Sequence, residues 1–296
     1  MKNNPLWIPA SEYVENSSIK KFISKINIKY SLNLQDYNDL YNWSIDNISQ
    51  FWIEVWDFND IVFSKKFTDV LKYSHILDAV WFSNAKLNYA ENLLKRKDDD
   101  TAIYFFGEDS VQYEISYNEL YLKVSQLSFS LKKMGIKKGD RVAAIMPNIP
   151  ETIIAMLATS SIGAIWSSCS PEFGGKTILD RFTQIMPKII FFSDGYYYKG
   201  KSHYIDSKVK RILKSLKSVK HIVAVNYISD KFSDWNKLFD NEANTIDFEQ
   251  VDFNHPLFIM YSSGTTGKPK SIVHSVGGTL LQHLKEHVFH VNLKKN

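Results

Sequence analysis

The chain of 296 residues is long enough for one large domain or two ordinary domains. Hydrophobic residues make up 44% of it and charged residues 23%, as in globular proteins that bury a core. The net charge of +4 is small, and the arginines are limited to Arg96, Arg141, Arg181 and Arg211. Because nucleic-acid-binding proteins concentrate basic residues and read bases with arginine, this composition argues against nucleic acid as a partner.

The single cysteine, Cys169, excludes an internal disulfide and fits a reducing compartment, which predicts a cytoplasmic protein. Cys169 lies in an apolar run and is interpreted as a small core residue, with a catalytic thiol as the alternative. The segment Met1–Ser11 has no apolar stretch long enough for a signal peptide. The uncharged run Thr152–Pro171 approaches the length of a membrane helix. Its serines and threonines favour a buried helix followed by a buried strand, so we expect no membrane span.

The first part of the chain, Met1–Leu94, is rich in aromatic residues. Two stretches in it, Ile19–Ile28 and Asn47–Trp56, carry apolar residues at helical spacing. A helical, aromatic-rich cap is therefore expected before the main domain. The charged segment Lys95–Asp100 is interpreted as a linker. This predicts a cap region over residues 1–97 and a second domain over residues 98–296.

From Thr101 onward, short apolar runs alternate with helical patterns. Ser116 and Glu119 form a capping box that starts a helix, which should run to Met134 and end at Gly135. Further helices are expected at Pro150–Ser161, Lys176–Gln184, Ser207–Leu216 and Ser233–Phe239. Strands are expected at Thr101–Phe106, Gln112–Ile115, Arg141–Met146, Ala164–Ser168, Lys188–Ser193, His221–Asn226 and Pro256–Tyr261. This alternation predicts an α/β fold with a mostly parallel sheet covered by helices on both faces, and ligands bound past the carboxyl ends of its strands.

One loop at such an end, Tyr261–Lys270, reads Tyr-Ser-Ser-Gly-Thr-Thr-Gly-Lys-Pro-Lys. Its glycines let backbone N–H groups approach a ligand, while its hydroxyls and lysines add donors and positive charge. The residues concerned are Ser262, Ser263, Gly264, Thr265, Thr266, Gly267, Lys268 and Lys270. It is not a Walker A loop, because Pro269 follows the Gly-Lys pair. The composition predicts a phosphate site, with a flexible polar surface loop as the alternative.

Two further patterns leave alternatives open. His283, His287 and His290 share one face of an expected helix over Gly278–His290, as metal ligands could, but a partly exposed helix face is the favoured interpretation. The segment Cys169–Gly175 precedes a helix, where its N–H groups could meet an anion, or it is a simple turn. No Ser-His-Asp order and no paired-carboxylate spacing indicates a catalytic group.

The loop Tyr261–Lys270 closely resembles the signature loop of the acyl-adenylate-forming, or AMP-binding, enzymes. Its continuation Ser271–His287, together with Trp81–Leu94 and Ile162–Phe173, is similar to the acetoacetyl-CoA synthetase branch. The resemblance implies a ligase that makes acetoacetyl-CoA from acetoacetate and CoA through an acyl-adenylate, with ATP and with Mg²⁺ bound through its phosphates. It places the β- and γ-phosphates on the serines, threonines, glycines and lysines of the loop.

By the same resemblance, CoA lies near Asp194–Lys201, where the family usually has an arginine and this chain has Tyr197. Lys199 or Lys201 is the expected substitute. The resemblance also implies that the catalytic lysine and the magnesium-binding glutamate lie beyond the chain end. The chain is then an N-terminal fragment, inactive alone, with the C-terminal half as a partner if a separate polypeptide supplies it. The alternatives are a non-catalytic nucleotide- or phosphate-binding remnant, or a ligase for another short-chain acid such as acetate or propionate.

Overall fold

The computed structural model of the chain describes residues 6–72, 75, 78–108, 110–262 and 267–294. Its contacts divide the chain into two compact units. The first unit comprises Met1–Ile61, Lys66–Ala85 and Gly277–Asn296, and the second comprises Val62–Lys65 and Lys86–Val276. The division at residue 97 that the sequence suggests stays a prediction.

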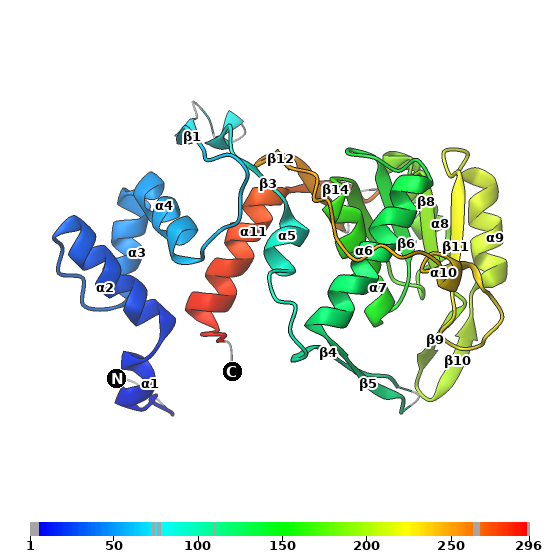
Figure 1. Ribbon diagram of the computed structural model, residues 1–296, viewed down its shortest axis with the longest axis horizontal. Coiled ribbons are helices and arrows are strands. Elements are labelled where there is room, and N and C mark those ends of the chain that lie inside the picture. The colour runs from blue at the N-terminus through cyan, green and yellow to red at the C-terminus, as the bar shows by residue number, and fades with distance from the viewer. Residues whose placement is uncertain (1–5, 73–74, 76–77, 109, 263–266, 295–296) are drawn as a thin grey trace. The chain divides into compact units, whose positions relative to one another are not determined.

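A six-stranded sheet forms the centre of the second unit (Figure 1). Its strand order is β11 (His221–Val225), β8 (Ile189–Ser193), β6 (Arg141–Ile145), β7 (Ile165–Cys169), β13 (Pro256–Ser262) and β14 (Lys270–Ser275). All neighbouring strands run parallel except β13 and β14, which form an antiparallel hairpin. The predicted mostly parallel sheet is therefore confirmed, and its five parallel strands lie within two residues of the expected bounds, whereas β14 was not predicted as a strand.

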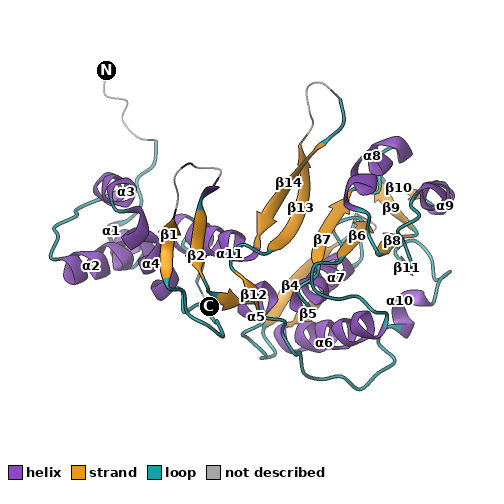
Figure 2. Ribbon diagram, turned by 90° about the horizontal axis from the view of Figure 1, so that it is seen from above, coloured by secondary structure: helices purple, strands orange, loops and turns teal. Residues whose placement is uncertain are grey.

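Helices cover both faces of this sheet (Figure 2). Helices α6 (Tyr117–Lys133) and α7 (Pro150–Ser161) lie on one face, and α8 (Gly175–Ile185) and α9 (Asp206–Ser215) lie on the other. Along β6, Val142 and Ala144 are buried in the first core, whereas Ala143 and Ile145 are buried in the second. Because successive side chains of a strand point to opposite faces, an uninterrupted apolar run is what a sheet covered on both sides requires.

The helix boundaries follow local chemistry. Ser116 Oγ accepts a hydrogen bond of 3.1 Å from the Glu119 N–H at the start of α6, as the capping box predicts. The Glu119 carboxylate lies 3.6 Å from Lys123 Nζ one turn later. The helix ends at Lys133, and Gly135 takes a φ of +79° just beyond it, which a glycine adopts without strain. These observations confirm the predicted extent of α6.

Short elements complete the second unit. They are β3 (Lys86–Leu87), α5 (Tyr89–Leu93), β4 (Thr101–Phe106), β5 (Gln112–Ser116), β9 (Gly195–Tyr198), β10 (Lys201–Tyr204), α10 (Asp234–Lys237) and β12 (Val251–Asp252). Both strands of the antiparallel pair β4–β5 were predicted, whereas the β9–β10 hairpin and the β3–β12 pair were missed. Elements of two to five residues carry too little periodicity to be read from sequence.

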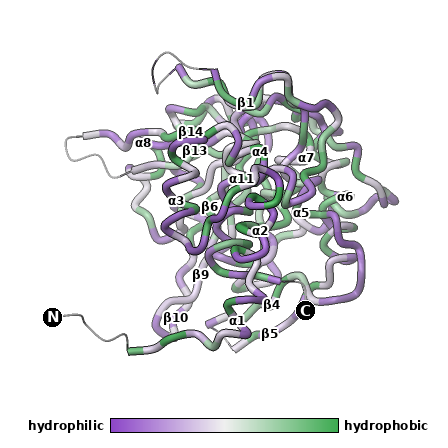
Figure 3. The backbone as a smooth tube through the Cα atoms, turned by 90° about the vertical axis from the view of Figure 1, so that its left-hand side faces the viewer, coloured by the Kyte–Doolittle hydropathy of each residue, from purple (hydrophilic) through white to green (hydrophobic). Residues whose placement is uncertain are grey.

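The first unit is mainly helical, as expected for the cap. Its elements are α1 (Ser11–Glu15), α2 (Ser18–Tyr30), α3 (Tyr37–Asp46), α4 (Ile48–Phe58), β1 (Asp69–Lys72) and β2 (Val80–Ser83), followed much later by α11 (Val276–Leu284) and the π-helical turn η2 (Lys285–His290). Helices α2 and α4 confirm the predictions, while α1 and α3 were missed. Hydrophobic and hydrophilic residues follow one another along α2, as expected for a helix with one buried face (Figure 3).

Aromatic rings hold the first unit together. The fully buried ring of Phe22 on α2 lies 6.0 Å from Phe51 and 5.4 Å from Phe58, both on α4. It also stacks on Phe289 of η2 at 4.4 Å between ring centroids. Such ring pairs add specific geometry to the burial of large apolar area. The end of the described chain is thereby built into the same core as its beginning.

A buried carboxylate also ties α2 to α4. Glu54 is completely buried, and its Oε1 accepts hydrogen bonds from Lys29 Nζ and, at 3.0 Å, from the Tyr30 hydroxyl. Lys25 Nζ lies 3.4 Å from Glu54 Oε2. Burial alone would raise the pKa of Glu54, but the hydrogen bonds from Lys29 and Tyr30 outweigh it and lower that pKa. The ion pairs therefore stabilise the folded unit while the carboxyl is charged.

We predict that Glu54→Gln lowers the free energy of unfolding by about 2 kcal/mol at pH 7, since it leaves the lysines facing a neutral, buried amide. A carboxyl with a lowered pKa contributes stability above its ordinary value of 4.5, and that contribution is lost as the pH falls through its folded-state pKa. The difference between variant and wild type should thus shrink in acid. Urea unfolding at pH 7 and pH 3 measures it, with Asp46→Asn, an exposed change at the end of α3, as the control. An equal loss at both pH values would contradict this account.

Candidate functional site

The predicted phosphate loop connects β13 and β14 at the edge of the sheet in the second unit. In the antiparallel register of the hairpin, Ser262 lies opposite Lys270, and Tyr261 lies opposite Ser271. Ser262 is thus the last residue of one arm and Lys270 the first of the other. Ser263, Gly264, Thr265 and Thr266 lie outside the described residues. The position of the loop is therefore known only from the residues at its two ends.

The described part of the loop keeps the features that phosphate binding needs. Gly267 has a φ of +141°, which side-chain-bearing residues rarely adopt, although a Cβ there would meet no other atom. The backbone conformation, and not lack of space, accounts for a glycine at this position. Lys268, two residues before β14, and Lys270, its first residue, are both exposed to solvent. Two cations and an accessible backbone are therefore available to an incoming anion.

The strand that enters the loop is anchored to its neighbour by side chains. Ser167 Oγ on β7 donates a hydrogen bond of 2.8 Å to Ile259 O on β13. The Tyr261 hydroxyl donates a bond of 3.2 Å to Arg181 O on α8, and burial raises the pKa of Tyr261. The phenol therefore stays protonated and keeps its role as a donor at neutral pH. These bonds fix the end of β13 just before Ser262.

The parallel strands β6, β7, β8 and β13 all end at the same edge of the sheet, so the loops that follow them gather there. After β7, the segment Pro171–Gly174 leads into α8. Lys208 Nζ on α9 donates to Phe173 O at 3.0 Å and also to Pro171 O. Burial lowers the pKa of Lys208. Sequence reasoning missed this lysine, because nothing in its local sequence indicates that it binds carbonyls of a distant turn.

Cys169, the last residue of β7, is buried, and burial raises the pKa of its thiol to about 12. A thiol with such a pKa is protonated at neutral pH and is a poor nucleophile. The interpretation of Cys169 as a core residue is therefore supported over the catalytic one. The segment that follows it contains a turn before α8, consistent with the simpler of the two interpretations of Cys169–Gly175.

The lysines predicted for CoA lie on the β9–β10 hairpin, which follows β8. Lys199 and Gly200 form its turn, both with positive φ, and Lys199 and Lys201 are exposed. Lys199 Nζ lies 5.3 Å from the centre of the Tyr198 ring. The strands β8 and β13 are three strand spacings apart, or roughly 14 Å. The structure thus puts both predicted binding regions beyond the same sheet edge but does not bring their lysines into contact.

Asp194 supports the base of this hairpin. It is completely buried, and its carboxylate accepts four hydrogen bonds of 2.8–3.0 Å. The donors are the N–H groups of Tyr227, Ile228 and Ser229 and the Ser229 hydroxyl. The Ile205 N–H, just after β10, donates to Asp194 O at 3.0 Å. A carboxylate with every acceptor direction used is a structural anchor, and sequence reasoning missed it.

The three histidines of the first unit do not converge. His283, His287 and His290 are exposed, and the rings of the first two are 6.2 Å apart, centre to centre. Among the residues that the structure describes, no group of three or more His, Cys, Asp and Glu side chains is arranged to hold a metal ion. Within the described ranges, no helix is long and apolar enough to cross a membrane.

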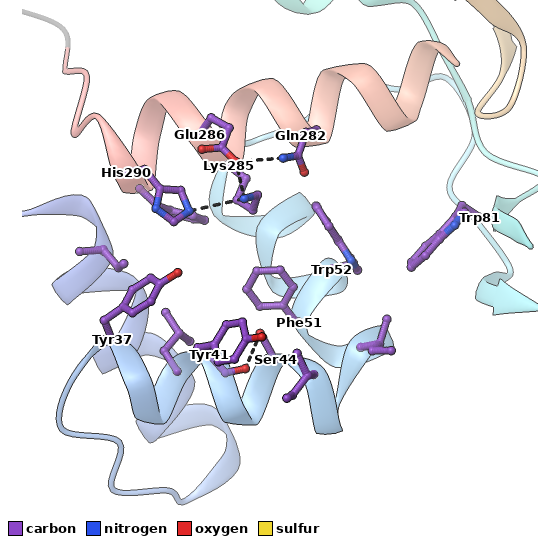
Figure 4. Close-up of a pocket in the computed structure, with 15 residues that line it drawn as sticks. Tyr37, Tyr41, Ser44, Phe51, Trp52, Trp81, Gln282, Lys285, Glu286 and His290 are labelled. Carbon is purple, nitrogen blue, oxygen red and sulfur yellow. Dashed lines mark hydrogen bonds and ion pairs between the residues drawn. The ribbon is translucent and has the colours of Figure 1, made fainter. Parts of the chain in front are cut away.

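The first unit also contains a cavity of about 590 Å³, between α3, α4 and the end of the chain (Figure 4). One wall is aromatic and includes Tyr37, Phe51 and Trp52. On the opposite wall, Lys285 Nζ donates to Glu286 Oε1 at 2.6 Å and lies 3.4 Å from His290 Nε2. None of the predicted phosphate residues lines this cavity, so it is separate from the loop site.

Comparison with known families decides what kind of protein carries this loop. The family described as "AMP-binding enzyme" matches residues 90–294, which is more than half of the chain. The chain belongs to the AMP-binding enzyme family. A second family, "Acetyl-coenzyme A synthetase N-terminus", matches residues 37–93 of this AMP-binding chain. The two matches together span both compact units.

Individual relatives confirm the resemblance to acetoacetyl-CoA synthetases. The chain is 45% identical over 302 residues to an acetoacetyl-coenzyme A synthetase from Rhizobium meliloti (strain 1021), covering 98% of this chain and 46% of the relative. It is 42% identical to one from Danio rerio, covering 100% and 46%. The solved structure of acetoacetyl-CoA synthetase from Streptomyces lividans superposes with a TM-score of 0.93 at 35% identity, covering 99% and 46%. The chain thus spans about half the length of the relatives it matches.

We predict that Asp194→Asn lowers the free energy of unfolding of the second unit by about 2 kcal/mol, because an amide NH₂ group faces donors where a carboxylate accepted them. Urea unfolding measures the loss. Asp230→Asn, an exposed change in the neighbouring turn, serves as the control and should have little effect. Equal stabilities for the two variants would show that the buried carboxylate is dispensable.

Proposed function

We propose that this chain provides the ATP-phosphate site of an acetoacetate–CoA ligase. The observation that carries the proposal is the loop Ser262–Lys270, which lies at the carboxyl edge of the sheet in a chain 45% identical to an acetoacetyl-coenzyme A synthetase. Its substrates are acetoacetate, ATP and CoA. The choice of acetoacetate as the acid substrate rests on the similarity to acetoacetyl-CoA synthetases, since no described residue of the loop distinguishes one short-chain acid from another.

The reaction proceeds in two displacements. In the first, a carboxylate oxygen of acetoacetate attacks the α-phosphorus of ATP, and the bond to pyrophosphate breaks. In the second, the CoA sulfur attacks the acyl carbon of the adenylate, AMP leaves, and the thiol proton is lost. Negative charge builds up on the leaving pyrophosphate in the first step. Groups that hold the β- and γ-phosphates therefore stabilise that transition state by charge and hydrogen bonds.

The loop has the groups for this task. We assign the β- and γ-phosphates to the residues Ser262, Ser263, Gly264, Thr265, Thr266, Gly267, Lys268 and Lys270. Hydroxyl and backbone N–H donors fix the oxygens, and the lysines supply charge where water is displaced. Lys270 lies opposite Ser262 at the neck of the hairpin, so that these two residues flank the turn. The short span between them lets donors from both arms reach one phosphate chain.

The same residues do not suit a bare metal ion. From Pro256 to Ser275 the sequence contains no carboxylate, and Mg²⁺ prefers such oxygen ligands or phosphates. We therefore expect Mg²⁺ to be bound through the phosphates, where it neutralises part of their charge. The protein's own contribution at this loop is to orient the phosphate chain.

Lys199 and Lys201 are proposed to contact the phosphates of CoA. They are exposed on a hairpin at the same sheet edge as the loop, separated from it by the strands β6 and β7. We place the reaction in the cytoplasm, because the single thiol, Cys169, is free and buried. A second polypeptide with the remaining part of the relatives' sequence is the proposed partner where one is made separately.

We predict that Lys270→Ala raises the dissociation constant for MgATP about tenfold, as the loss of one charged hydrogen bond implies. Isothermal titration of the chain with MgATP measures the change. Lys201→Ala is the matched control, since it removes an exposed lysine from the other hairpin and should leave ATP affinity unchanged. An equal loss in both variants would indicate attraction by overall charge instead of a phosphate site.

Activity is tested by ATP-dependent pyrophosphate release with acetoacetate, acetate and propionate as competing acids. The chain is assayed alone and mixed with a polypeptide that corresponds to the unmatched part of the Rhizobium meliloti relative. Release that is fastest with acetoacetate in either arm supports the proposal. If the chain binds MgATP but releases no pyrophosphate either alone or in the mixture, a non-catalytic nucleotide-binding protein is favoured. Faster release with acetate or propionate would identify that acid as the substrate in place of acetoacetate.

A further inference from the structure

We propose that Gln184 is a positioning residue for the ATP-binding hairpin, and that it acts by holding the β14 arm on both sides of Lys270. The proposal rests on the function proposed above and adds to it the group that sets where this arm lies. Gln184 belongs to α8, the helix that packs beside β13, and not to the hairpin itself.

The carboxamide of Gln184 contacts the two neighbours of Lys270. Its Nε2 donates a hydrogen bond of 3.1 Å to Pro269 O, and its Oε1 accepts one of 3.0 Å from Ser271 Oγ. One planar group thus binds the chain immediately before and immediately after the lysine. A residue held on both sides has little freedom to shift along the strand, so the direction in which Lys270 leaves the backbone is restricted.

Gln184 is itself held in place. Its Nε2 also donates a bond of 2.6 Å to Asp180 O, one turn earlier on α8. The helix is fixed to the sheet by Ile178 and Phe182, both completely buried in the core on this face. The carboxamide is therefore oriented by a rigid element before any ligand arrives, which is what a positioning group requires.

The other arm of the hairpin is held by the same helix. The guanidinium of Arg181 lies 5.1 Å from the centre of the Phe173 ring and 5.5 Å from that of Tyr261. Its backbone carbonyl accepts the bond from the Tyr261 hydroxyl at 3.2 Å. Arg181 and Gln184 are three residues apart, on one face of α8. Helix α8 thus contacts β13 at the residue before Ser262, and it contacts the β14 arm at the residues on either side of Lys270.

The side chain of Gln184 is exposed, so removing it leaves no cavity and no buried unsatisfied group. A role in folding would be expected of a buried residue, whereas loss of an exposed clamp should change the hairpin and little else. The effect of removing the Gln184 side chain should therefore be confined to the hairpin. The change in the hairpin can be measured without ATP.

The first test is limited proteolysis of the full chain with trypsin. Trypsin does not cleave after Lys268, because Pro269 follows, so the susceptible bond of the hairpin is Lys270–Ser271. We expect Gln184→Ala to speed cleavage at this bond about fivefold, as the loss of one or two exposed hydrogen bonds implies. Thr183→Ala is the matched control, since Thr183 is the exposed neighbour whose hydroxyl bonds Leu179 O within the helix. An unchanged rate for Gln184→Ala overturns the proposal.

The second test asks whether Gln184 acts through Lys270. Affinity for MgATP is measured for the wild type, Gln184→Ala, Lys270→Ala and the double variant. We expect Gln184→Ala to weaken binding about fivefold alone and to have little further effect once Lys270 is gone. A full additional loss in the double variant overturns the proposal, because Gln184 would then act independently of the lysine.

A conservative variant separates the two bonds. Gln184→Glu keeps an acceptor for Ser271 Oγ but cannot donate to Pro269 O while its carboxylate is charged. We expect it to lie between the wild type and Gln184→Ala in tryptic cleavage. Should the wild-type chain bind no ATP, the function proposed above fails, and the cleavage rates still decide the role of Gln184.

Discussion

Burial of one sheet on both faces is the constraint on which the rest of the second unit depends. The strands β6, β7 and β8 place apolar side chains alternately in two separate cores, so each strand must be covered by helices on both sides. Parallel strands with helical crossovers satisfy this demand, and they bring all the outgoing loops to one edge. Polar loops such as Ser262–Lys270 lie at that edge, because the covered faces of the central strands are filled mainly by apolar side chains.

Much of this architecture could be read from the sequence, because local signals agreed with the fold. Pro150 at the start of α7 and the capping box at Ser116 set helix starts that the structure confirms. The β9–β10 hairpin was missed, since its tyrosine-rich arms alternate weakly and the Lys199–Gly200 turn is the sole cue. Nor could the sequence show that Phe289 packs on Phe22, because no periodicity links residues so far apart.

The candidate site also has a part that the sequence predicts and a part that only the structure shows. Residue types within one loop predicted phosphate binding, and resemblance to a known family predicted which residues would do it. The groups that support the loop could not be predicted, because each acts across a long separation in sequence. Lys208 binds the Phe173 carbonyl, Asp194 binds three N–H groups beyond β11, and Gln184 binds β14. Residues that bind ligand have local signatures, whereas residues that orient them are defined by the fold.

The central claim is that the phosphates of ATP are held by the hairpin of β13 and β14. Hydrogen–deuterium exchange of the full chain, with and without saturating MgATP, tests it most directly. The account predicts slower exchange in peptides that contain Ser262–Ser271, and unchanged exchange in peptides from α3 and α4, which line the aromatic cavity of the first unit. Protection confined to those helices, or no protection of the hairpin at ligand saturation, would contradict it.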